Sequence, residues 1–451
     1  MSRTKSSERL VGLACVLVGA TFFVVLGFVL ARTSPNGSCD FEPVYYHSRV
    51  LIEHNDPYFE TNSNYAQLNA GGFLNPNSLT PVDQIQIPCV YPPTALVVAA
   101  PLALLKWHAA DLIWMSLSAA SIVVAALLIW SAAADYSPTL AGVLIGFILI
   151  NSITVLFEGN AAALAVGLSV IALALFLKQR LELLGLICLA ISLCLKPHDG
   201  AFVWLFLFLS GGTLRRRAWE TVSTFLLLSL PAVLWVSSFS PHWPQEMRAN
   251  MASISGIGGV NNPGPTSTTS HITNSAINLQ TVFSVVVDRP SFYNPASYFV
   301  CGIILLCFGW AIIRDRGSAE RQWLGIAIIS ALAMLPVYHR HHDARMLLLA
   351  IPACALLWRR RDTLGKIGTL ITFMAISITG DIPRAILDRL ESGYQFNAAD
   401  LPAKLEMIIF TRPAPLVLLM MTVVFLVLYV RSTAPTARGE TEPEAVRLVK
   451  T

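Results

Sequence analysis

The chain has 451 residues, of which 55% are hydrophobic and only 13% are charged, with a mean hydropathy of +0.61. Soluble globular proteins carry about 25% charged residues, so this composition excludes a soluble globular chain and predicts a membrane protein. The net charge is +4, and the basic residues form short scattered clusters. Nucleic acid is therefore not an expected partner, and we interpret the clusters as signals of membrane topology.

The first predicted element is a membrane helix at the N-terminus. Arg3, Lys5 and Arg9 precede an apolar run over residues 10–31. This run is longer than the core of a signal peptide, and no Ala-x-Ala-like cleavage site follows it. We interpret it as an uncleaved first span, with a cleaved signal peptide as the alternative.

Further apolar runs follow along the whole chain. Counting the first, about twelve runs have a length that suits a membrane helix. They cover residues 10–31, 109–131, 139–157, 161–177, 182–196, 199–212, 218–238, 295–313, 322–338, 344–358, 365–380 and 414–430. The run at 94–105 is too short to cross and is expected to be re-entrant or interfacial. The pattern predicts an all-α polytopic membrane protein with one transmembrane domain over residues 1–431 and a disordered tail over 432–451.

The basic clusters orient these spans. With the N-terminus in the cytoplasm and 94–105 not crossing, the inner side receives the clusters at 178–180, 215–217, 314–321 and 359–366, and also Arg431. Both termini and the tail are then cytoplasmic, as expected in the inner membrane of a bacterium. The outer, periplasmic side receives a large first loop at 32–108, a second at 239–294, and the segments 157–160, 196–199, 338–345 and 381–413. All nine histidines lie on that side, which predicts a functional site there.

Asp40 is the leading catalytic candidate. It lies just beyond the first span, before an aromatic stretch that contains Tyr45 and Tyr46. A carboxylate at the boundary between lipid and water can act as a general base that takes a proton from a hydroxyl. A solvated charge or an N-cap for the following segment is the alternative. Residues 44–53 are consistent with a short amphipathic helix on the membrane surface.

The rest of the first loop contains two further motifs. Asp56-Pro57-Tyr58 is either a recognition motif or a plain turn, and Tyr91-Pro92-Pro93 is either part of a site or a rigid entry into the 94–105 segment. Interfacial tyrosines are commonly membrane anchors. Cys39 and Cys89 border the loop, and if it is periplasmic a disulfide between them is chemically allowed.

Residues 338–345 are the densest polar cluster. They contain three histidines, two arginines and an aspartate. Arginine and histidine at a lipid surface suit an anionic head group, above all a phosphate. A zinc site formed by His339, His342 and Asp343 is a competing interpretation, although the spacing lacks a usual ligand pattern. A solvated loop is the third.

Lys196, His198 and several asparagines complete the candidates. Lys196 lies at a turn between two apolar runs, where it can extend to water or add a positive charge to a phosphate pocket. Asn160 and Asn274, together with Asn261, Asn262 and His271, could supply hydrogen bonds to a sugar. Turn formation is the alternative for the asparagines.

In their order along the chain, these residues resemble glycosyltransferase family 87, a family of membrane glycosyltransferases of the GT-C fold that use polyprenyl-phosphate sugars. The resemblance covers the chain from Asp40 to about Leu356. The motifs that carry it are Asp40 with Tyr45-Tyr46, Asp56-Pro57-Tyr58, Tyr91-Pro92-Pro93 with Pro101-Leu102, Gly159-Asn160, Lys196-Pro197, Asn274-Ser275 and the histidine cluster. The family commonly has Gly-Gln-x-Asn where this chain has Gly159-Asn160-Ala161-Ala162, and a glycine where it has Asn55.

The resemblance implies an inverting transferase with its active site outside the cytoplasm. Asp40 would be the general base, the sugar a hexose with mannose expected, and the acceptor a lipid or glycan. The donor phosphate would be bound by Lys196, His339, Arg340, His341, His342 and Arg345, without a metal or another cofactor. The sugar and the acceptor would be bound by Tyr45, Tyr46, Asp56, Tyr58, Tyr91, Asn160, His198 and Asn274.

A transporter or flippase for a lipid-linked or anionic solute is the alternative from another class. It would place paired charges near the middle of the membrane and would show repeat symmetry. No internal repeat is evident, and Glu158, Lys196 and Asp199 fall at the predicted ends of apolar runs. The transferase is therefore the preferred interpretation.

Overall fold

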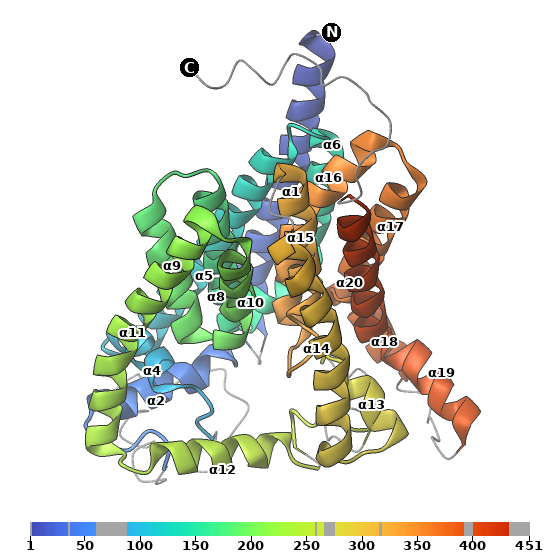
Figure 1. Ribbon diagram of the computed structural model, residues 1–451. Coiled ribbons are helices and arrows are strands. Elements are labelled where there is room, and N and C mark those ends of the chain that lie inside the picture. The colour runs from blue at the N-terminus through green and yellow to red at the C-terminus, as the bar shows by residue number, and fades with distance from the viewer. Residues whose placement is uncertain are drawn as a thin grey trace.

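The computed structural model describes residues 2–34, 37–59, 88–257, 259–265, 276–314, 318–391 and 400–432. In these ranges the regular structure is helical, apart from one isolated bridge between Ala276 and Arg340. The predicted all-α class is confirmed. Figure 1 shows most of the helices running between the two ends of the molecule, with α12 (Trp243–Ser255) lying across one end.

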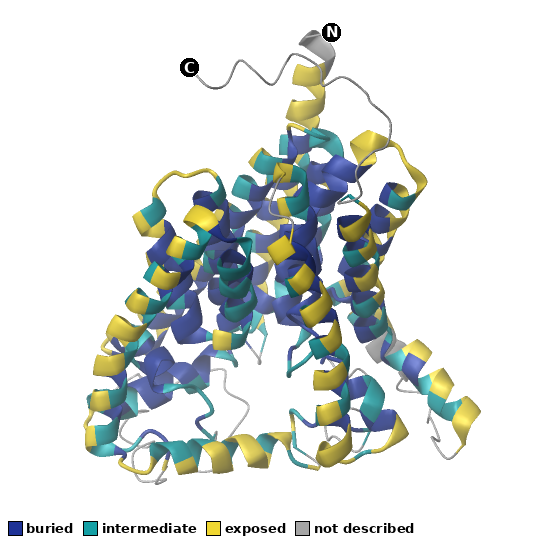
Figure 2. Ribbon diagram, viewed as in Figure 1, coloured by how far each residue is buried: buried dark blue, intermediate teal, exposed yellow. Residues whose placement is uncertain are grey.

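Five of the described helices are long and apolar enough to cross a membrane. They are α1 (Ser2–Thr33), α5 (Trp107–Ala133), α11 (Gly212–Phe239), α14 (Pro290–Arg314) and α20 (Pro413–Arg431). Each coincides with a predicted span. Their outward faces carry large exposed apolar side chains, such as Leu227, Leu306 and Val423, and Figure 2 shows buried residues concentrated in the middle of the bundle. This distribution suits helices that face lipid.

Shorter helices fill the rest of the bundle. They are α6 (Pro138–Ile150), α7 (Ile153–Phe157), α8 (Ala161–Leu177), α9 (Glu182–Leu195), α10 (Pro197–Ser210), α15 (Ala319–Leu332), η2 (His341–Ala350), α16 (Ile351–Arg360) and α17 (Thr363–Ile378). Helix α8 is buried over almost its whole length, packed by α5 and α9. It therefore forms the centre of the core.

Two predicted spans differ from the structure. The span at 139–157 is divided into α6 and α7 because Asn151 and Ser152 form a turn between them. The span at 344–358 starts in a tight 3-10 helix, η2, and becomes α-helical only at α16, where Pro352 lies in the first turn. The expected total of about twelve spans therefore stays a prediction, since the described helices do not correspond one to one with the apolar runs.

The two ends of the bundle carry different elements. At one end Arg9 pairs with Asp135 at 2.7 Å, Arg360 pairs with Glu320, and Arg321 donates to the backbone of residue 432. Figure 1 shows the N-terminus at this end. The opposite end carries α2 (Phe41–Ile52), α4 (Pro93–Ala103), α12, α13 (Gln280–Val286), α18 (Asp381–Glu391) and α19 (Leu401–Thr411). Arg9, Arg321 and Arg360 thus lie at the end away from these helices, and the assignment of the two ends to the two sides of a membrane stays a prediction.

Helix α4 confirms one expectation and α2 corrects another. Helix α4 has 11 residues, about 17 Å at 1.5 Å per residue, which is too short to cross a membrane. Helix α2 packs against α4 and is buried on both faces, including Tyr45, His47 and Ser48. The short helix predicted at residues 44–53 is thus present, but its apolar face packs against α4 instead of being left open to lipid.

The disulfide that the sequence allows is not formed, since Cys39 and Cys89 are not bonded to each other. Cys39 precedes the first residue of α2, whereas Cys89 packs with Leu51 near the last. Helix α2 has 12 residues and is about 18 Å long, while a disulfide requires Cα atoms about 4.4–6.8 Å apart. Cys39 and Cys89 therefore lie near opposite ends of α2, too far apart for a disulfide.

Candidate functional site

The turn that carries Asp40 is held by two other segments. The backbone N–H groups of Ser38 and Asp40 donate to the carbonyls of Phe157 and Glu158, each at 2.8 Å. The Ser38 hydroxyl donates to the buried carboxylate of Asp111 on α5 at 2.6 Å. These bonds fix the start of α2 against the end of α7.

Gly159 permits this close approach. Its φ is +67°, and a Cβ atom on it would lie 3.0 Å from Cβ of Phe41 and 3.3 Å from Cα of Ser38. Trp114 donates its indole N–H to the Gly159 carbonyl at 2.8 Å. A larger residue would both strain the backbone and push the Asp40 turn away.

The Asp40 side chain does not cap the helix that it precedes. It occupies the N-cap position of α2, but it makes no hydrogen bond to the first turn of that helix. Instead Oδ2 accepts a hydrogen bond from Nδ2 of Asn160 at 2.6 Å, while Oδ1 of Asn160 accepts from Ala162 and caps α8. The carboxylate is 28% exposed. The N-cap alternative is therefore wrong, and Asp40 is oriented yet reachable.

His342 and Glu158 complete what we call the Asp40 cluster, namely Asp40, Glu158, Asn160 and His342. Nε2 of His342 lies 2.9 Å from Oε2 of Glu158 and 3.9 Å from Oδ2 of Asp40. Burial alone would raise the pKa of Glu158, but the charge and hydrogen bonding of His342 lower it below its ordinary value. Glu158 is therefore ionised, with its carboxylate against the His342 ring.

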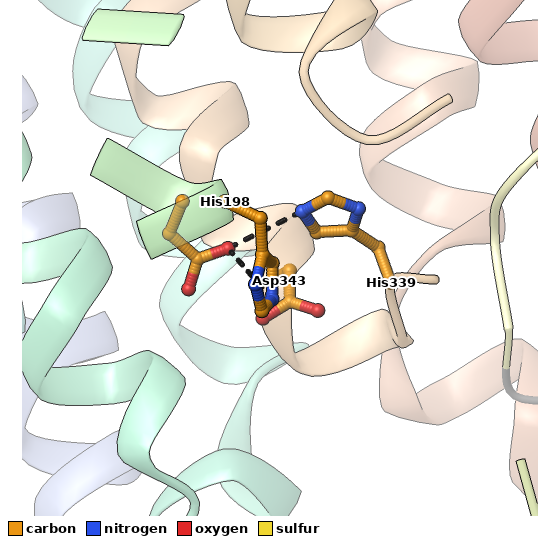
Figure 3. A group of neighbouring side chains, drawn as sticks. His198, His339 and Asp343 are labelled. Carbon is orange, nitrogen blue, oxygen red and sulfur yellow. Dashed lines mark ion pairs between the residues drawn. The ribbon is translucent and has the colours of Figure 1, made fainter. Parts of the chain in front are cut away.

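A second group, the Lys196 cluster, contains Lys196, His198, Asp199, His339 and Asp343. The Lys196 ammonium donates to the Asp343 carboxylate and lies 3.6 Å from Asp199. Nε2 of His339 lies 3.4 Å from Asp199, and the His198 and His339 rings are 4.7 Å apart. Figure 3 shows the side chains of His198, His339 and Asp343 gathered at one place.

The Lys196 cluster is buried and its charges are largely balanced. Only 15% of the Lys196 side chain and 3% of Asp343 are exposed, so Lys196 does not extend to water. Burial would raise the pKa of Asp343, but the charges of Lys196 and His339 hold it far below its ordinary value. Burial would lower the pKa of His339, yet the Asp199 and Asp343 carboxylates raise it.

Tyr91 connects the two clusters. Its hydroxyl lies 3.4 Å from the Asp40 carbonyl and donates to it. Burial and then the charge of Asp40 raise the pKa of this hydroxyl, while Lys196 acts in the opposite direction. Tyr91 is therefore close enough to both Asp40 and Lys196 for their charges to act on its hydroxyl.

Two groups of side chains have the geometry to hold a metal ion in the part of the chain that the structure describes. One is His198, Asp199, His339 and Asp343, and the other is Cys39, Asp40 and Glu158. In the first group the Lys196 ammonium already pairs with both carboxylates, and its positive charge opposes the binding of a metal cation. The zinc ligands considered from the sequence do not converge, because His342 faces Glu158 whereas His339 faces Asp199.

Some residues that were predicted to bind the sugar or the acceptor are buried in the hydrophobic core. Tyr45 and Tyr46 are fully buried in an aromatic cluster with Phe41, Trp107 and Trp114, and the Tyr45 hydroxyl donates to the Leu105 carbonyl at 2.7 Å. Their position favours a structural role over sugar binding. Asn274, with His271, lies outside the described residues.

Asp56 and Tyr58 form the plain turn that the sequence left open. Oδ1 of Asp56 accepts from the backbone N–H groups of Tyr58 and Phe59 at 2.8 and 3.2 Å. The Tyr58 hydroxyl donates to the Tyr91 carbonyl at 2.7 Å and is buried. Both residues thus support the loop that carries Tyr91.

The two predicted phosphate-binding arginines both hydrogen-bond to other segments of the protein. Arg340 donates to the Val260 carbonyl at 3.1 Å and to Oδ1 of Asn261 at 3.0 Å, which attaches the segment after α12 to the site. Arg345 is 2% exposed and donates to the carbonyls of His341 and Thr379. Arg345 therefore fixes η2 to the end of α17, a position that favours a structural role.

Sequence reasoning did not assign a role to Glu158, Asp111, Asp199 or Arg384. Asp111 could have been selected from the sequence, because an ionisable residue inside an apolar run is expected to have a structural or functional partner. Arg384 donates to Nε2 of His341 at 2.9 Å, a contact that no pattern near Arg384 indicated.

The family model of glycosyltransferase family 87 matches residues 90–337, which is more than half of the chain. The matched range contains Tyr91, Glu158, Asn160 and Lys196, and it lies between Asp40 and the histidine cluster. Comparison with curated proteins finds no match.

The fold was also compared with solved structures. The chain is similar to the apo form of the Archaeoglobus fulgidus oligosaccharyltransferase, with 11% identity, a TM-score of 0.40, and coverage of 91% of this chain and 56% of that one. It is similar to the archaeal oligosaccharyltransferase AglB from Archaeoglobus fulgidus in complex with an inhibitory peptide and a dolichol-phosphate, with 11% identity, a TM-score of 0.35, and coverage of 93% and 56%. The chain thus spans 56% of the length of these proteins.

Proposed function

The chain belongs to glycosyltransferase family 87 and is a membrane glycosyltransferase; we propose that it transfers a hexose, with mannose expected, from a polyprenyl-phosphate sugar to a lipid or glycan acceptor. The family membership favours this reaction over the transporter alternative. The reaction would take place at the end of the bundle that carries α2, α4 and α12.

One observation carries the assignment of the base. The Asp40 carboxylate leaves its own helix uncapped and is held by Asn160, so that it is oriented but partly exposed. A general base must reach the proton that it removes and must keep a fixed direction. Asn160 donates to Oδ2 only, which leaves Oδ1 available for a hydroxyl of the acceptor.

The proposed step balances as a direct displacement. Asp40 takes the proton of the acceptor hydroxyl, and the acceptor oxygen forms a bond to the anomeric carbon. The bond from that carbon to the phosphate oxygen breaks, and the prenyl phosphate leaves with the electron pair. Because attack and departure occur on opposite faces of the sugar, the anomeric configuration inverts, and a β-linked donor gives an α-linked product.

Charge on the leaving phosphate requires stabilisation by cations. His342 lies in the Asp40 cluster, 2.9 Å from Glu158. Interaction with Tyr338, and then with the charges of Asp40 and Glu158, raises the pKa of Arg340 against the effect of burial, so Arg340 lies near the same cluster. Fixed cations aimed at developing negative charge can replace a metal in this role. We therefore propose His342 and Arg340 as phosphate ligands, with His341 beside them and Lys196 and His339 as the charged support behind Asp40.

The position of Arg9, Arg321 and Arg360 at the end away from α2, α4 and α12 supports the proposed orientation. The end that collects Arg9, Arg321 and Arg360 suits the cytoplasmic side. Asp40 would then face the periplasm of a bacterial inner membrane, where a lipid-linked donor in the outer leaflet can reach it.

Replacement of Asp40 by Asn tests the proposal. The amide can still accept the Asn160 hydrogen bond but cannot take a proton, so sugar transfer from polyprenyl-phosphate-mannose should fall by about 100-fold or more. Purified protein in lipid nanodiscs would be assayed for radiolabelled sugar in the product, with thermal unfolding as the check of folding.

Asp56→Asn is the matched control, because it makes the same chemical change in the same loop. An asparagine can accept the two turn hydrogen bonds of Asp56, so this variant should keep wild-type activity. Equal activity in Asp40→Asn and wild type would remove Asp40 from the mechanism.

A further inference from the structure

Asn261 joins the chain segment that follows α12 to Tyr338 and Arg340. Its side-chain oxygen, Oδ1, accepts a hydrogen bond from the Tyr338 hydroxyl at 2.6 Å and another from Nη2 of Arg340 at 3.0 Å. Nη2 of Arg340 also donates to the Val260 carbonyl at 3.1 Å. The segment is therefore attached directly to a residue that we propose as a phosphate ligand.

The same segment is attached to α12, which lies across one end of the bundle (Figure 1). The backbone N–H of Asn261 donates to the carbonyl of Ile254, in the last turn of α12, at 2.7 Å. Asn250 holds α12 to the first loop, because its Nδ2 donates to the carbonyls of Tyr58 and Cys89 at 3.2 and 3.1 Å. None of the residues of α12 is buried, so hydrogen bonds such as these are important for its position.

The guanidinium of Arg340 needs such a tether to keep a fixed position. The backbone of Arg340 is already fixed, since its N–H donates to Oδ2 of Asp343 at 2.9 Å. The guanidinium, however, lies at the end of a long side chain, and holding an arginine side chain in one conformation costs entropy. The bonds to Asn261 and Val260 supply this order before a ligand arrives, so that binding a ligand does not have to.

The tether leaves the guanidinium able to bind an anion. A guanidinium has five N–H donors, and the bonds to Asn261 and Val260 both leave from Nη2, so a phosphate can be bound through Nη1 and Nε. Burial lowers the pKa of Arg340, but Tyr338, Asp40 and Glu158 raise it. The charge of the guanidinium is therefore felt at the Asp40 cluster.

We infer that Asn261 is a positioning residue: it holds the Arg340 guanidinium beside the Asp40 cluster, and it thereby couples the position of α12 to binding of the donor phosphate. The inference rests on the proposed function, which assigns Arg340 to that phosphate. The sequence suggested Asn261 only as a hydrogen-bonding partner of a sugar. In the structure its side-chain oxygen already accepts from two donors of the protein.

A double-mutant cycle tests whether Asn261 acts through Arg340. Protein in phosphatidylcholine nanodiscs would be titrated with labelled undecaprenyl phosphate, with thermal unfolding as the check of folding. Arg340→Gln removes a charged ligand and should weaken binding by about 10- to 100-fold. Asn261→Ala removes only the tether and should weaken binding by about three- to tenfold. The double variant should bind like Arg340→Gln alone, because without the guanidinium the tether has nothing to position.

Asn250→Ala is the matched control. It makes the same truncation of the same residue type and also loosens α12, but Asn250 bonds to the first loop and not to Arg340. Any loss of binding that it causes should therefore multiply with the loss caused by Arg340→Gln.

Hydrogen exchange gives a second readout, which a purely structural role of Asn261 would not move. If the tether strengthens phosphate binding, bound phosphate must strengthen the tether by the same factor. Undecaprenyl phosphate should therefore slow backbone hydrogen exchange in α12 of the wild type. This slowing should be absent from Asn261→Ala and from Arg340→Gln.

The outcomes separate the inference from the proposed function. Wild-type binding by Asn261→Ala, or losses that simply multiply in its double variant with Arg340→Gln, would overturn the inference. Wild-type binding by Arg340→Gln would overturn the inference together with the assignment of Arg340 to the phosphate. Coupling between Asn261 and Arg340 supports the inference even if Asp40→Asn keeps full transfer activity, a result that would refute Asp40 as the base.

Discussion

The Asp40 cluster and the Lys196 cluster lie side by side but differ in how their charges are used. In the Lys196 cluster, Lys196 and Asp343 form a buried pair with 15% and 3% of their side chains exposed. In the Asp40 cluster, the Asp40 carboxylate is 28% exposed and receives its direction from the neutral amide of Asn160. The Lys196 cluster pairs its charges within the protein, whereas the Asp40 cluster leaves the Asp40 carboxylate accessible to a substrate.

The comparison indicates a division of roles. A buried ion pair costs desolvation free energy, and separating its partners would leave an uncompensated buried charge. The pair therefore fixes the relative positions of the two segments that carry it. Here it fixes the α9–α10 turn to η2, and η2 carries His342 to Asp40. The Lys196 cluster positions the site, and the Asp40 cluster is where chemistry is expected.

The largest effect that tests this division of roles is expected from Asp343→Asn. The change leaves the Lys196 ammonium buried with only Asp199 at 3.6 Å, and removing one partner of a buried pair costs about 3–5 kcal/mol. We expect a loss near the lower limit, measured as a reduced free energy of unfolding in detergent. Asp40→Asn, by contrast, should leave stability unchanged.

A double variant separates the pair from other effects of Asp343. In Lys196→Gln with Asp343→Asn both charges are gone, and most of the lost stability should return. If Asp343→Asn alone is as stable as the wild type, Lys196 does not depend on it and the division of roles fails.

Asn160→Ser should produce a smaller effect, on rate instead of stability. Serine is a good N-cap and preserves the start of α8, but it cannot reach Asp40 with a side-chain amide. Hydrogen bonds to charged groups contribute about 1.5–3 kcal/mol, so kcat should fall by about tenfold or more while KM and the unfolding temperature stay close to wild type. An unchanged kcat would mean that the Asn160 amide does not orient the base.

The smallest effect is expected from the titration of His339. Its pKa is raised in the folded protein, so the charged ring stabilises the fold below its unfolded pKa of about 6.5. This contribution is lost as the pH rises through the folded pKa. The unfolding temperature of the wild type should therefore decline over that window, and His339→Gln should remove this part of the decline; identical pH profiles would contradict the assignment.

Some of the site could be predicted from local sequence. Asp40, Lys196 and the histidines of 339–342 were selected because charged and aromatic residues in the gaps of an apolar chain need a reason to be there. Their partners could not be selected in this way. Asn160 is 120 residues from Asp40 and Asp343 is 147 residues from Lys196, and no pattern of nearby residues encodes such pairs.

Tyr45 and Tyr46 illustrate the opposite error. Aromatic residues next to a candidate base suggested ligand binding. In the structure α4 and α5 cover them, and the Leu105 carbonyl accepts a hydrogen bond from the Tyr45 hydroxyl. Whether an aromatic ring faces a ligand or a core depends on which other helices pack on it. The sequence near the ring contains no information about that.

By itself the sequence determined that this is a helical membrane protein and where most of its helices lie, and it predicted on which side the polar residues collect. Those properties follow from hydropathy over windows the length of a helix and from the unequal distribution of Arg and Lys, which are local quantities. Only the tertiary structure decided that Asn160 orients Asp40, that Asp343 neutralises Lys196, and that Asn261 accepts a hydrogen bond from Arg340. Contacts between distant segments depend on the packing of whole helices, which no single stretch of sequence specifies.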